Sequence, residues 1–251
     1  MDRDSSAEPE RRGGAFYDDP GVFERYRSHR RWAENPNVVM EEPAVIEEFG
    51  SVSGLRVLDL GCGDASTGRL LLEAGVASYL GVDGSERMVD AAGAALTDPR
   101  AQVVRCDIEE FDASAASFDL VLSRMALHYV ADISVVFDRC HAWLAPGGRI
   151  VFSVVHPVVS SNDPRASTDQ PREDWVVDNY FLTGPRYQLW LGAQSRWYHR
   201  TTEDYVRALQ GAGFSLRKLR ECPPDRARFE NETEFRRRQR IPLVLLLSAG
   251  R

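Results

Sequence analysis

The stretch Val57-Leu58-Asp59-Leu60-Gly61-Cys62-Gly63-Asp64-Ala65-Ser66 decides the fold that this chain is expected to adopt. It opens with a short apolar run that is typical of a buried strand, and two glycines stop that strand. A segment with helical character follows. Glycines at such a turn let the backbone approach a ligand without a clash from a Cβ atom. The stretch therefore predicts a ligand site at the end of a buried strand.

Strands and helices alternate on both sides of this stretch. The expected strands cover residues 56–60, 78–82, 102–106, 118–122 and 149–155, and the expected helices cover residues 67–74, 86–96 and 133–144. This alternation predicts an α/β fold with a parallel sheet and helices on both of its faces. Ligand sites in such folds lie at the carboxyl ends of the strands. The polar residues at or near these ends are Asp59, Asp83, Asp107, Ser123 and His156.

The spacing of two acidic residues around the glycines indicates the kind of ligand. Asp83 follows Gly63 by twenty residues and ends the second strand, where a carboxylate can accept both ribose hydroxyls of an adenosine. The dinucleotide fingerprint would require a glycine at position 66, where Ser66 stands. Asp64 would also repel a pyrophosphate at the start of the helix. The sequence therefore favours an adenosine-containing ligand that carries an ammonium group.

Five segments together resemble one enzyme family. The string Asp59-Leu60-Gly61-Cys62-Gly63 resembles motif I of the class I S-adenosylmethionine-dependent methyltransferases. Further similar segments follow in order at residues 82–88, 106–108, 118–121 and 144–149, so the resemblance covers roughly residues 50–156. It implies a Rossmann-like, seven-stranded, mostly parallel sheet with an antiparallel last strand, and S-adenosyl-L-methionine as cofactor. Two more expected strands, at 215–220 and 242–248, agree with this.

The resemblance assigns roles to residues around the glycine turn. It implies that Asp83 holds the ribose, Asp107 meets the adenine amino group and Ile108 packs on the ring. A helix N-cap for Asp83, a turn carboxylate for Asp107 and a core position for Met88 remain open. We expect Asp59 to brace the glycine turn. The expected cofactor-binding residues are Tyr26, Arg30, Asp59, Gly61, Cys62, Gly63, Asp83, Gly84, Met88, Asp107, Ile108 and Ser123.

The segment ahead of the sheet has two parts. Residues 1–13 hold no large apolar side chain and predict a flexible tail. Residues 14–50 mix aromatic and charged side chains and predict one or two helices. In the resembling family such residues often form a lid over the cofactor, and a helix packed on the sheet is the alternative. The face of Tyr26 near a sulfonium would gain cation–π energy of about 0.5–2 kcal/mol.

Residues 157–200 interrupt the alternation within an expected methyltransferase domain of residues 51–251. They contain three of the five tryptophans, which suits the wall of a pocket for a flat or apolar acceptor. The expected substrate-binding residues are Tyr17, Trp175, Tyr180, Trp190 and Trp197. Further along, Arg236-Arg237-Arg238 has three glutamates beside it and predicts a solvated face.

Three histidines are candidates for a catalytic base. His128 follows the fourth strand, His156 ends the fifth, and His199 precedes the last large helix. A histidine can take a proton at neutral pH, and a base is needed only when the nucleophile must lose one. A packing role is open for each. His156 is slightly preferred, because Pro157 restricts its backbone to an extended form and so fixes its direction, and His199 comes third. His29 and His141 are expected at the surface or in packing contacts.

Composition excludes several classes of protein. A net charge of −7 and a pI of about 5.4 disfavour a nucleic-acid partner. No apolar run approaches the length of a membrane span, and the first residues predict no signal peptide. The four cysteines form no CxxC pair, so we expect neither a metal site nor disulfides. We expect buried free thiols in a protein of the reducing cytoplasm.

The sequence therefore predicts a cytoplasmic methyltransferase for a small-molecule acceptor, related to the branch that includes ubiquinone and menaquinone methyltransferases. Oxygen, nitrogen and carbon nucleophiles all remain open, as do a monomer and a homodimer. Two other classes are weaker alternatives. A nucleotide-dependent oxidoreductase is disfavoured by Asp64 and Ser66, and a non-catalytic protein that binds S-adenosylmethionine would show no turnover.

Overall fold

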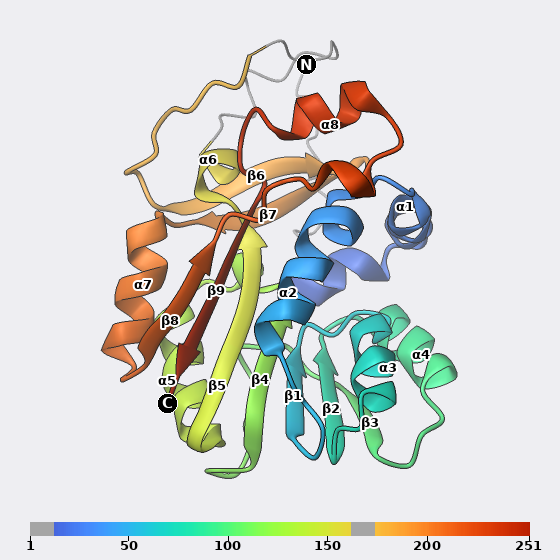
Figure 1. Cartoon of the computed structure of the whole chain (residues 1–251), viewed down its shortest axis with the longest axis vertical. Coiled ribbons are helices and arrows are strands. Elements are labelled where there is room, and N and C mark those ends of the chain that lie inside the picture. Colours follow the sequence, from blue (N-terminus) through green and yellow to red (C-terminus); the bar gives the residue numbers. More distant parts are fainter. Residues whose placement is uncertain (1–12, 162–173) are drawn as a thin grey trace, which may run out of the picture.

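A seven-stranded sheet in the order β3-β2-β1-β4-β5-β9-β8 forms the centre of the computed structural model, which describes residues 13–161 and 174–251 (Figure 1). The first five strands pair in parallel, and β9 is antiparallel to both β5 and β8. The expected mostly parallel sheet with an antiparallel last strand is therefore confirmed. The strands are β1 (Arg56–Leu60), β2 (Ser78–Asp83), β3 (Ala101–Arg105), β4 (Phe118–Arg124), β5 (Leu144–Val155), β8 (Ser215–Arg220) and β9 (Val244–Gly250).

Helices cover both faces of this sheet because the central strands are apolar on both sides. In β1, Val57 packs into one core cluster and its neighbour Leu58 into the other. One cluster joins the sheet to α5 (Ile133–Trp143) and α7 (Thr202–Gly211). The other joins it to α2 (Glu42–Phe49), α3 (Ser66–Glu73) and α4 (Glu86–Ala95).

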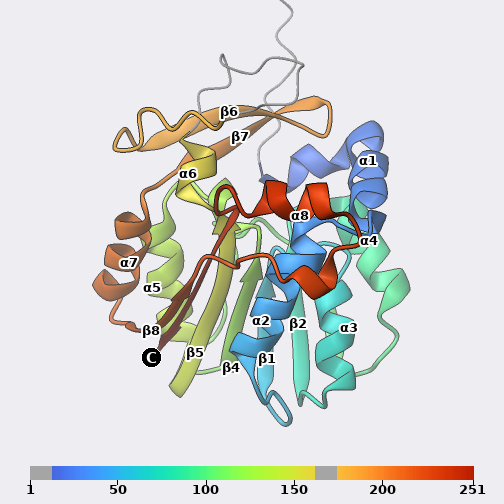
Figure 2. The same ribbon diagram turned by 45° about the horizontal axis from the view of Figure 1, so that its top comes forward.

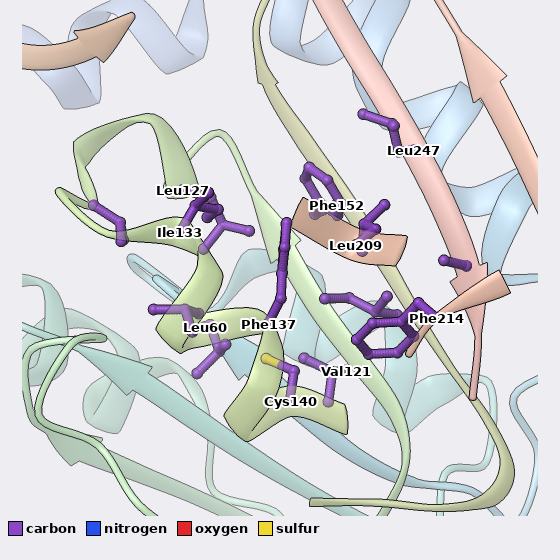
Figure 3. Close-up of a cluster of buried hydrophobic side chains, with 14 of the residues drawn as sticks. Leu60, Val121, Leu127, Ile133, Phe137, Cys140, Phe152, Leu209, Phe214 and Leu247 are labelled. Carbon is purple, nitrogen blue, oxygen red and sulfur yellow. The ribbon is translucent and has the colours of Figure 1, made fainter. Parts of the chain in front are cut away.

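The cluster under α5 and α7 is drawn in Figure 3. Phe137 of α5 and Phe152 of β5 lie with their ring centroids 5.1 Å apart, and Leu209 of α7 packs beside them. Burial of each such side chain contributes about 1.5–3 kcal/mol. This packing holds β4 and β5 rigidly, and the loops that follow these strands form part of the site.

The glycine turn lies at the point where the strand order reverses. The chain leaves β1 toward β2 on one side, while β4 pairs with β1 on the other side. A crevice forms outside the carboxyl ends of strands at such a reversal. The backbone N–H groups of Gly61 and Cys62 both donate to the carbonyl of Val82, at 2.7 and 3.0 Å, which joins the turn to β2.

A separate two-stranded hairpin stands over this edge of the sheet (Figure 2). It consists of β6 (Gly184–Trp190) and β7 (Ala193–His199), which pair in antiparallel register. Leu191 and Gly192 form its two-residue turn, and both have positive φ, as the tightest hairpin turns require. The hairpin lies inside the segment 157–200, for which the sequence predicts a pocket wall but no strands. Residues 162–173 of that segment lie outside the described residues.

Short elements surround the same edge. Ahead of α2, the chain forms η1 (Gly13–Asp18), α1 (Pro20–Arg31) and η2 (Asn37–Glu41), in agreement with the expected helices. The expected tail lies outside the described residues except for Gly13. Within residues 13–161 and 174–251, the remaining elements are η3 (Leu127–Tyr129), α6 (Pro157–Ser160), η5 (Arg226–Arg228) and α8 (Glu232–Arg238). Among the described helices, none has the length and apolar character that a membrane span requires.

Candidate active site

A cavity of about 480 Å³ lies at the carboxyl edge of the sheet, where the loops, η1, α1 and the hairpin meet. One end is bounded by the glycine turn and by the loops after β2 and β3. The other end is bounded by the hairpin and α8, which Figure 2 shows above the sheet edge. The volume is typical of sites for small organic ligands.

The glycine turn requires its glycines for geometric reasons. Gly61 and Gly63 have φ angles of 74° and 57°, in the left-handed region. A Cβ atom on Gly61 would stand 2.3 Å from the Cβ of Ala126, so a larger residue does not fit there. Both glycines line the cavity. The turn thus presents bare backbone to whatever occupies this end.

Asp83 is held rigidly at the same end. One carboxylate oxygen accepts the N–H of Gly63 at 2.9 Å, and the other accepts the N–H of Ser85 at 2.9 Å. Burial raises the pKa of Asp83, and these two hydrogen bonds counteract the rise. Each oxygen keeps a further lone pair, and the residue lines the cavity.

Asp59 carries an unsatisfied oxygen. Its Oδ2 accepts the hydroxyl of Tyr79 at 2.9 Å, whereas its Oδ1 is buried and has no hydrogen-bond partner among the described residues. Burial raises its pKa to about 7, although Tyr79 and the charge of Arg124 lower it. Asp59 also lines the cavity. A cationic ligand group would compensate this buried carboxylate.

Most of the other expected cofactor residues meet around this end. Tyr26 reaches the glycine turn from α1, and burial raises its pKa to about 12. The further expected residues that line the cavity are Arg30, Cys62, Gly84, Met88, Asp107 and Ile108. Burial raises the pKa of the Cys62 thiol, which disfavours a reactive thiolate.

Ser123 is the one expected cofactor residue that is absent from the described cavity wall. It is fully buried, and its hydroxyl donates to the carbonyl of Leu60 at 2.7 Å. Since Leu60 ends β1 and Ser123 belongs to β4, this bond joins the two central strands beside the glycine turn.

Aromatic rings line the cavity on the side of the hairpin, and Tyr17 among them also contacts Tyr26, with ring centroids 5.3 Å apart. Trp197 of the hairpin lies edge-on to His128, with ring centroids 5.3 Å apart, and Trp190 stands 6.4 Å from Trp197. Tyr17 of η1 is hydrogen-bonded to Tyr129 through their hydroxyl groups at 2.9 Å. All these residues line the cavity. The arrangement suits a flat or apolar ligand that is largely enclosed.

Two expected substrate residues lie elsewhere. The indole N–H of Trp175 donates to the carbonyl of Val158 at 3.0 Å. The hydroxyl of Tyr180 lies 3.5 Å from that of Thr202, at the start of α7. Neither belongs to the described lining of the cavity. They connect the segment around the hairpin to α6 and α7.

Of the three candidate bases, the structure places only His128 in the described cavity wall. It is buried, and its Nδ1 has no hydrogen-bond partner among the residues described. Burial, aided by the charge of Arg200, lowers its pKa to about 3. The imidazole is therefore neutral over the whole physiological pH range, and one of its ring nitrogens has a lone pair that can accept a hydrogen bond.

The other two candidates have both ring nitrogens engaged. His156 accepts the N–H of Val158 at Nδ1, and its Nε2 lies 3.1 Å from the Glu221 carboxylate. His199 contacts the Ser160 hydroxyl at 2.7 Å and the Tyr180 carbonyl at 2.8 Å. The hydrogen bonds of both histidines tie α6 to neighbouring segments.

A buried ion-pair network in the cavity wall was not anticipated from the sequence. Arg124, the last residue of β4, donates to Glu41, Glu42 and Thr67. Burial alone would lower the pKa of Arg124, but the charges of and hydrogen bonds to Glu41 and Glu42 raise it. The only available signal was an arginine two residues after the apolar strand expected at 118–122.

The arginine run of α8 is only partly a solvated face. Arg236 is 75% exposed, as expected, but the side chain of Arg238 is only 10% exposed and lines the cavity. The solvated-face prediction is therefore wrong for Arg238. Its guanidinium lies over the ring of Trp32, 5.6 Å from the centroid. His29, expected at the surface or in packing, packs its ring on Trp190 at 5.3 Å and also lines the cavity.

Comparison with known proteins places this geometry in a family. A family model for a methyltransferase domain matches residues 58–152. The crystal structure of an S-adenosylmethionine-dependent methyltransferase from Mesorhizobium loti superposes with a TM-score of 0.78 at 36% identity, over 84% of this chain and 97% of that one. The chain belongs to the S-adenosylmethionine-dependent methyltransferases. The expected enzyme class and cofactor are thereby confirmed.

Two relatives show how far this similarity extends. An uncharacterized protein of Haemophilus influenzae is 26% identical over a 246-residue alignment that covers 94% of this chain and 96% of that protein. The ubiquinone biosynthesis O-methyltransferase of Rhizobium etli is 33% identical over a 110-residue alignment that covers 42% of this chain and 43% of that enzyme. The likeness to the ubiquinone enzyme thus spans less than half of either methyltransferase.

Proposed function

We propose that this methyltransferase acts on a small-molecule acceptor, which binds at the aromatic end of the cavity. The observation that carries the proposal is the continuity of one cavity from the glycine turn to the rings of Trp190 and Trp197. An acceptor held there lies within reach of a methyl group presented from the glycine turn. The net charge of −7 disfavours a nucleic-acid acceptor.

The residues at the glycine end fit the cofactor. Asp83 offers the free lone pairs of a fixed carboxylate to the ribose hydroxyls, and Met88 and Ile108 supply apolar contacts for the adenine. The unpartnered Oδ1 of Asp59 suits the ammonium group. Bound S-adenosylmethionine supplies an electrophilic methyl group on a sulfonium. The chain's contribution is to align the acceptor with that methyl group.

His128 is proposed as the base for a hydroxyl acceptor. The acceptor oxygen forms its bond to the methyl carbon as the carbon–sulfur bond breaks, and the electron pair of that bond stays on sulfur. The hydroxyl proton passes to the imidazole of His128. A low pKa makes His128 a weak base in the free enzyme, but transfer removes the sulfonium charge as the imidazolium charge appears. The total charge in the cavity therefore stays constant, which limits the cost of protonating a buried histidine.

The N-terminal elements are proposed as the lid over the cofactor. Gly13 and Gly14 of η1 line the cavity beside Gly84, and Tyr26 of α1 faces the glycine turn. The four cysteines are free thiols, which suits the reducing cytoplasm that we propose as the location. We propose either a monomer or a homodimer.

The test uses S-adenosylmethionine with a tritiated methyl group, the purified enzyme and a bacterial cell extract. We expect label in the low-molecular-mass fraction. Label that appears only in protein or nucleic acid would contradict a small-molecule acceptor. Once the acceptor is purified, His128→Ala should lower kcat at least a hundredfold while the affinity for S-adenosylhomocysteine is kept.

His141→Ala is the matched control for the base. The ring of His141 packs on Phe214, away from the described cavity wall, so the change should leave kcat near the wild-type value. If His128→Ala also retains wild-type kcat, alignment alone carries the reaction, and an amine or carbon nucleophile replaces the hydroxyl.

A further inference from the structure

The far end of the cavity contains a buried cation with unused hydrogen-bonding capacity. The side chain of Arg238 is nine-tenths buried, and its Nη2 lies 3.1 Å from the carboxylate of Glu234. Its Nε has no hydrogen-bond partner among the residues that the structure describes. A guanidinium normally offers five N–H donors to acceptors in a fixed planar geometry. Arg238 therefore retains donors that a ligand could satisfy.

The carboxylate nearest to Arg238 also pairs with a second guanidinium group. Glu234 is shared between Arg238 and Arg237, whose Nη1 lies 2.9 Å from the same carboxylate. One carboxylate therefore faces two guanidinium groups. The negative charge of Glu34 raises the pKa of Arg238, but no ion pair within 4 Å joins the two side chains in the described structure. The carboxylate of Glu34 already accepts the backbone N–H of Asn231 at 2.7 Å. Burial and the charge of Arg237 together lower the pKa of Arg238 despite both glutamates.

The other buried arginine of the cavity differs in this respect. Arg124 donates through all three of its guanidinium nitrogens, to Glu41, Glu42, Thr67 and the carbonyl of Asn37. Its charge and its donors are therefore already matched within the protein. An anionic ligand group would gain little at Arg124 and more at Arg238.

Ring contacts connect Arg238 to the proposed reaction centre along one wall. Arg238 covers Trp32, whose ring centroid lies 6.1 Å from that of His29, and His29 packs on Trp190. Trp190 then contacts Trp197, which contacts His128. All the members of this series line the cavity. These rings therefore form a continuous lining between Arg238 and His128.

We propose that Arg238 binds a carboxylate of the acceptor, so that the substrates are aromatic or similarly flat monocarboxylates. This inference rests on the proposed function, because it places the acceptor at the aromatic end. A carboxylate matches the planar edge formed by Nε–H and one Nη–H. A phosphate dianion fits less well, since Glu234 stands beside the same guanidinium and would repel the second charge.

The experiment measures binding of three aromatic carboxylates to the full-length protein saturated with S-adenosylhomocysteine. Benzoate, phenylacetate and cinnamate are each compared with the neutral primary amide of the same shape by titration calorimetry. We expect at least one carboxylate to bind tenfold or more tightly than its amide. Arg238→Gln should reduce that preference to about onefold, while the affinity for S-adenosylhomocysteine stays unchanged.

Arg236→Gln provides the matched control, because Arg236 lies on the same helix, pairs with Glu232 and is exposed. It should keep the full carboxylate preference. Equal binding of all three carboxylates and their amides to the wild type would overturn the inference, and so would a preference that survives in Arg238→Gln. Failure of the wild type to bind S-adenosylhomocysteine would instead overturn the cofactor placement. A rise in melting temperature with S-adenosylhomocysteine shows that each variant is folded.

Discussion

Asp59 is the residue at which stability and ligand binding oppose each other most directly. Its folded-state pKa of about 7 lies above the ordinary value of 3.8, so the folded protein holds a proton that the unfolded chain releases. The stability that this proton contributes is present below about pH 4 and is lost as the pH rises through 7. At pH 8, Asp59→Asn should therefore raise the free energy of unfolding by about 2 kcal/mol. It should also weaken the binding of S-adenosylhomocysteine.

Denaturant unfolding at pH 8 and calorimetric titration check both effects. Asp119→Asn is the control in which the free energy of unfolding should change in the opposite direction. Hydrogen bonds from Arg56 lower the pKa of Asp119, so its charged carboxylate stabilises the folded protein. That variant should be destabilised at pH 8 and bind the cofactor normally. Loss of stability in Asp59→Asn, together with unchanged binding, would show that Asp59 only braces the turn.

His128 should give the protein a distinct pH dependence. Its pKa is about 3 in the folded state against an ordinary 6.5, so the unfolded chain binds the proton between these values. Its contribution to stability is complete above pH 6.5 and falls as the pH drops toward 3. The stability of the wild type relative to His128→Gln should decrease by about 2 kcal/mol from pH 7 to pH 5. If the difference in unfolding free energy between the wild type and His128→Gln is the same at pH 7 and pH 5, the pKa of His128 is not lowered in the folded protein.

The N-terminal element η1 depends on a close contact between two glycines. A Cβ atom on Gly14 would stand 2.4 Å from the backbone of Gly84, in the loop after β2. Asp18 also fixes η1 there, since it accepts the hydroxyl of Ser85 at 2.6 Å. Gly14→Ala should displace η1 and raise the Kd for S-adenosylhomocysteine about tenfold, a loss of about 1.4 kcal/mol.

Gly93→Ala is the control for this element, because a Cβ atom there meets no other atom within 4 Å and α4 gains a better helix former. Its Kd should match that of the wild type. If Gly14→Ala binds equally well, η1 does not cover the cofactor.

Regular elements were predictable where local pattern and tertiary packing agree. The strands around Gly61 are short, continuous apolar runs because helices cover both of their faces, and their short length together with the glycines and turns between them favours strands over helices. The hairpin was harder to predict, because residues of β6 are alternately half-buried and exposed, and the hairpin lies over a ligand cavity and not over the hydrophobic core. The sequence signal that was available is Leu191-Gly192 between two alternating runs, which is typical of a tight hairpin turn.

At the scale of the whole molecule, the cavity joins segments that are far apart in the chain. The glycine end could be predicted because Gly61, Gly63, Asp83 and Asp107 all follow strands of one sheet, and sheet topology brings such ends together. No such rule places α8 beside α1. Arg238 therefore looked solvated in the sequence, since its burial depends on packing between elements about two hundred residues apart.

The central claim is that one cavity binds the cofactor at the glycine turn and the acceptor under the hairpin. Thermal unfolding with S-adenosylhomocysteine tests it on the wild type, Asp83→Ala and Trp190→Ala. A ligand that binds only the folded state at a hundred times its Kd stabilises by about 2.7 kcal/mol, so the wild-type Tm should rise by roughly 5 °C or more. Trp190→Ala should show the same rise, Asp83→Ala should lose most of it, and NAD should give none. A rise with NAD, or an undiminished rise in Asp83→Ala, would contradict the account.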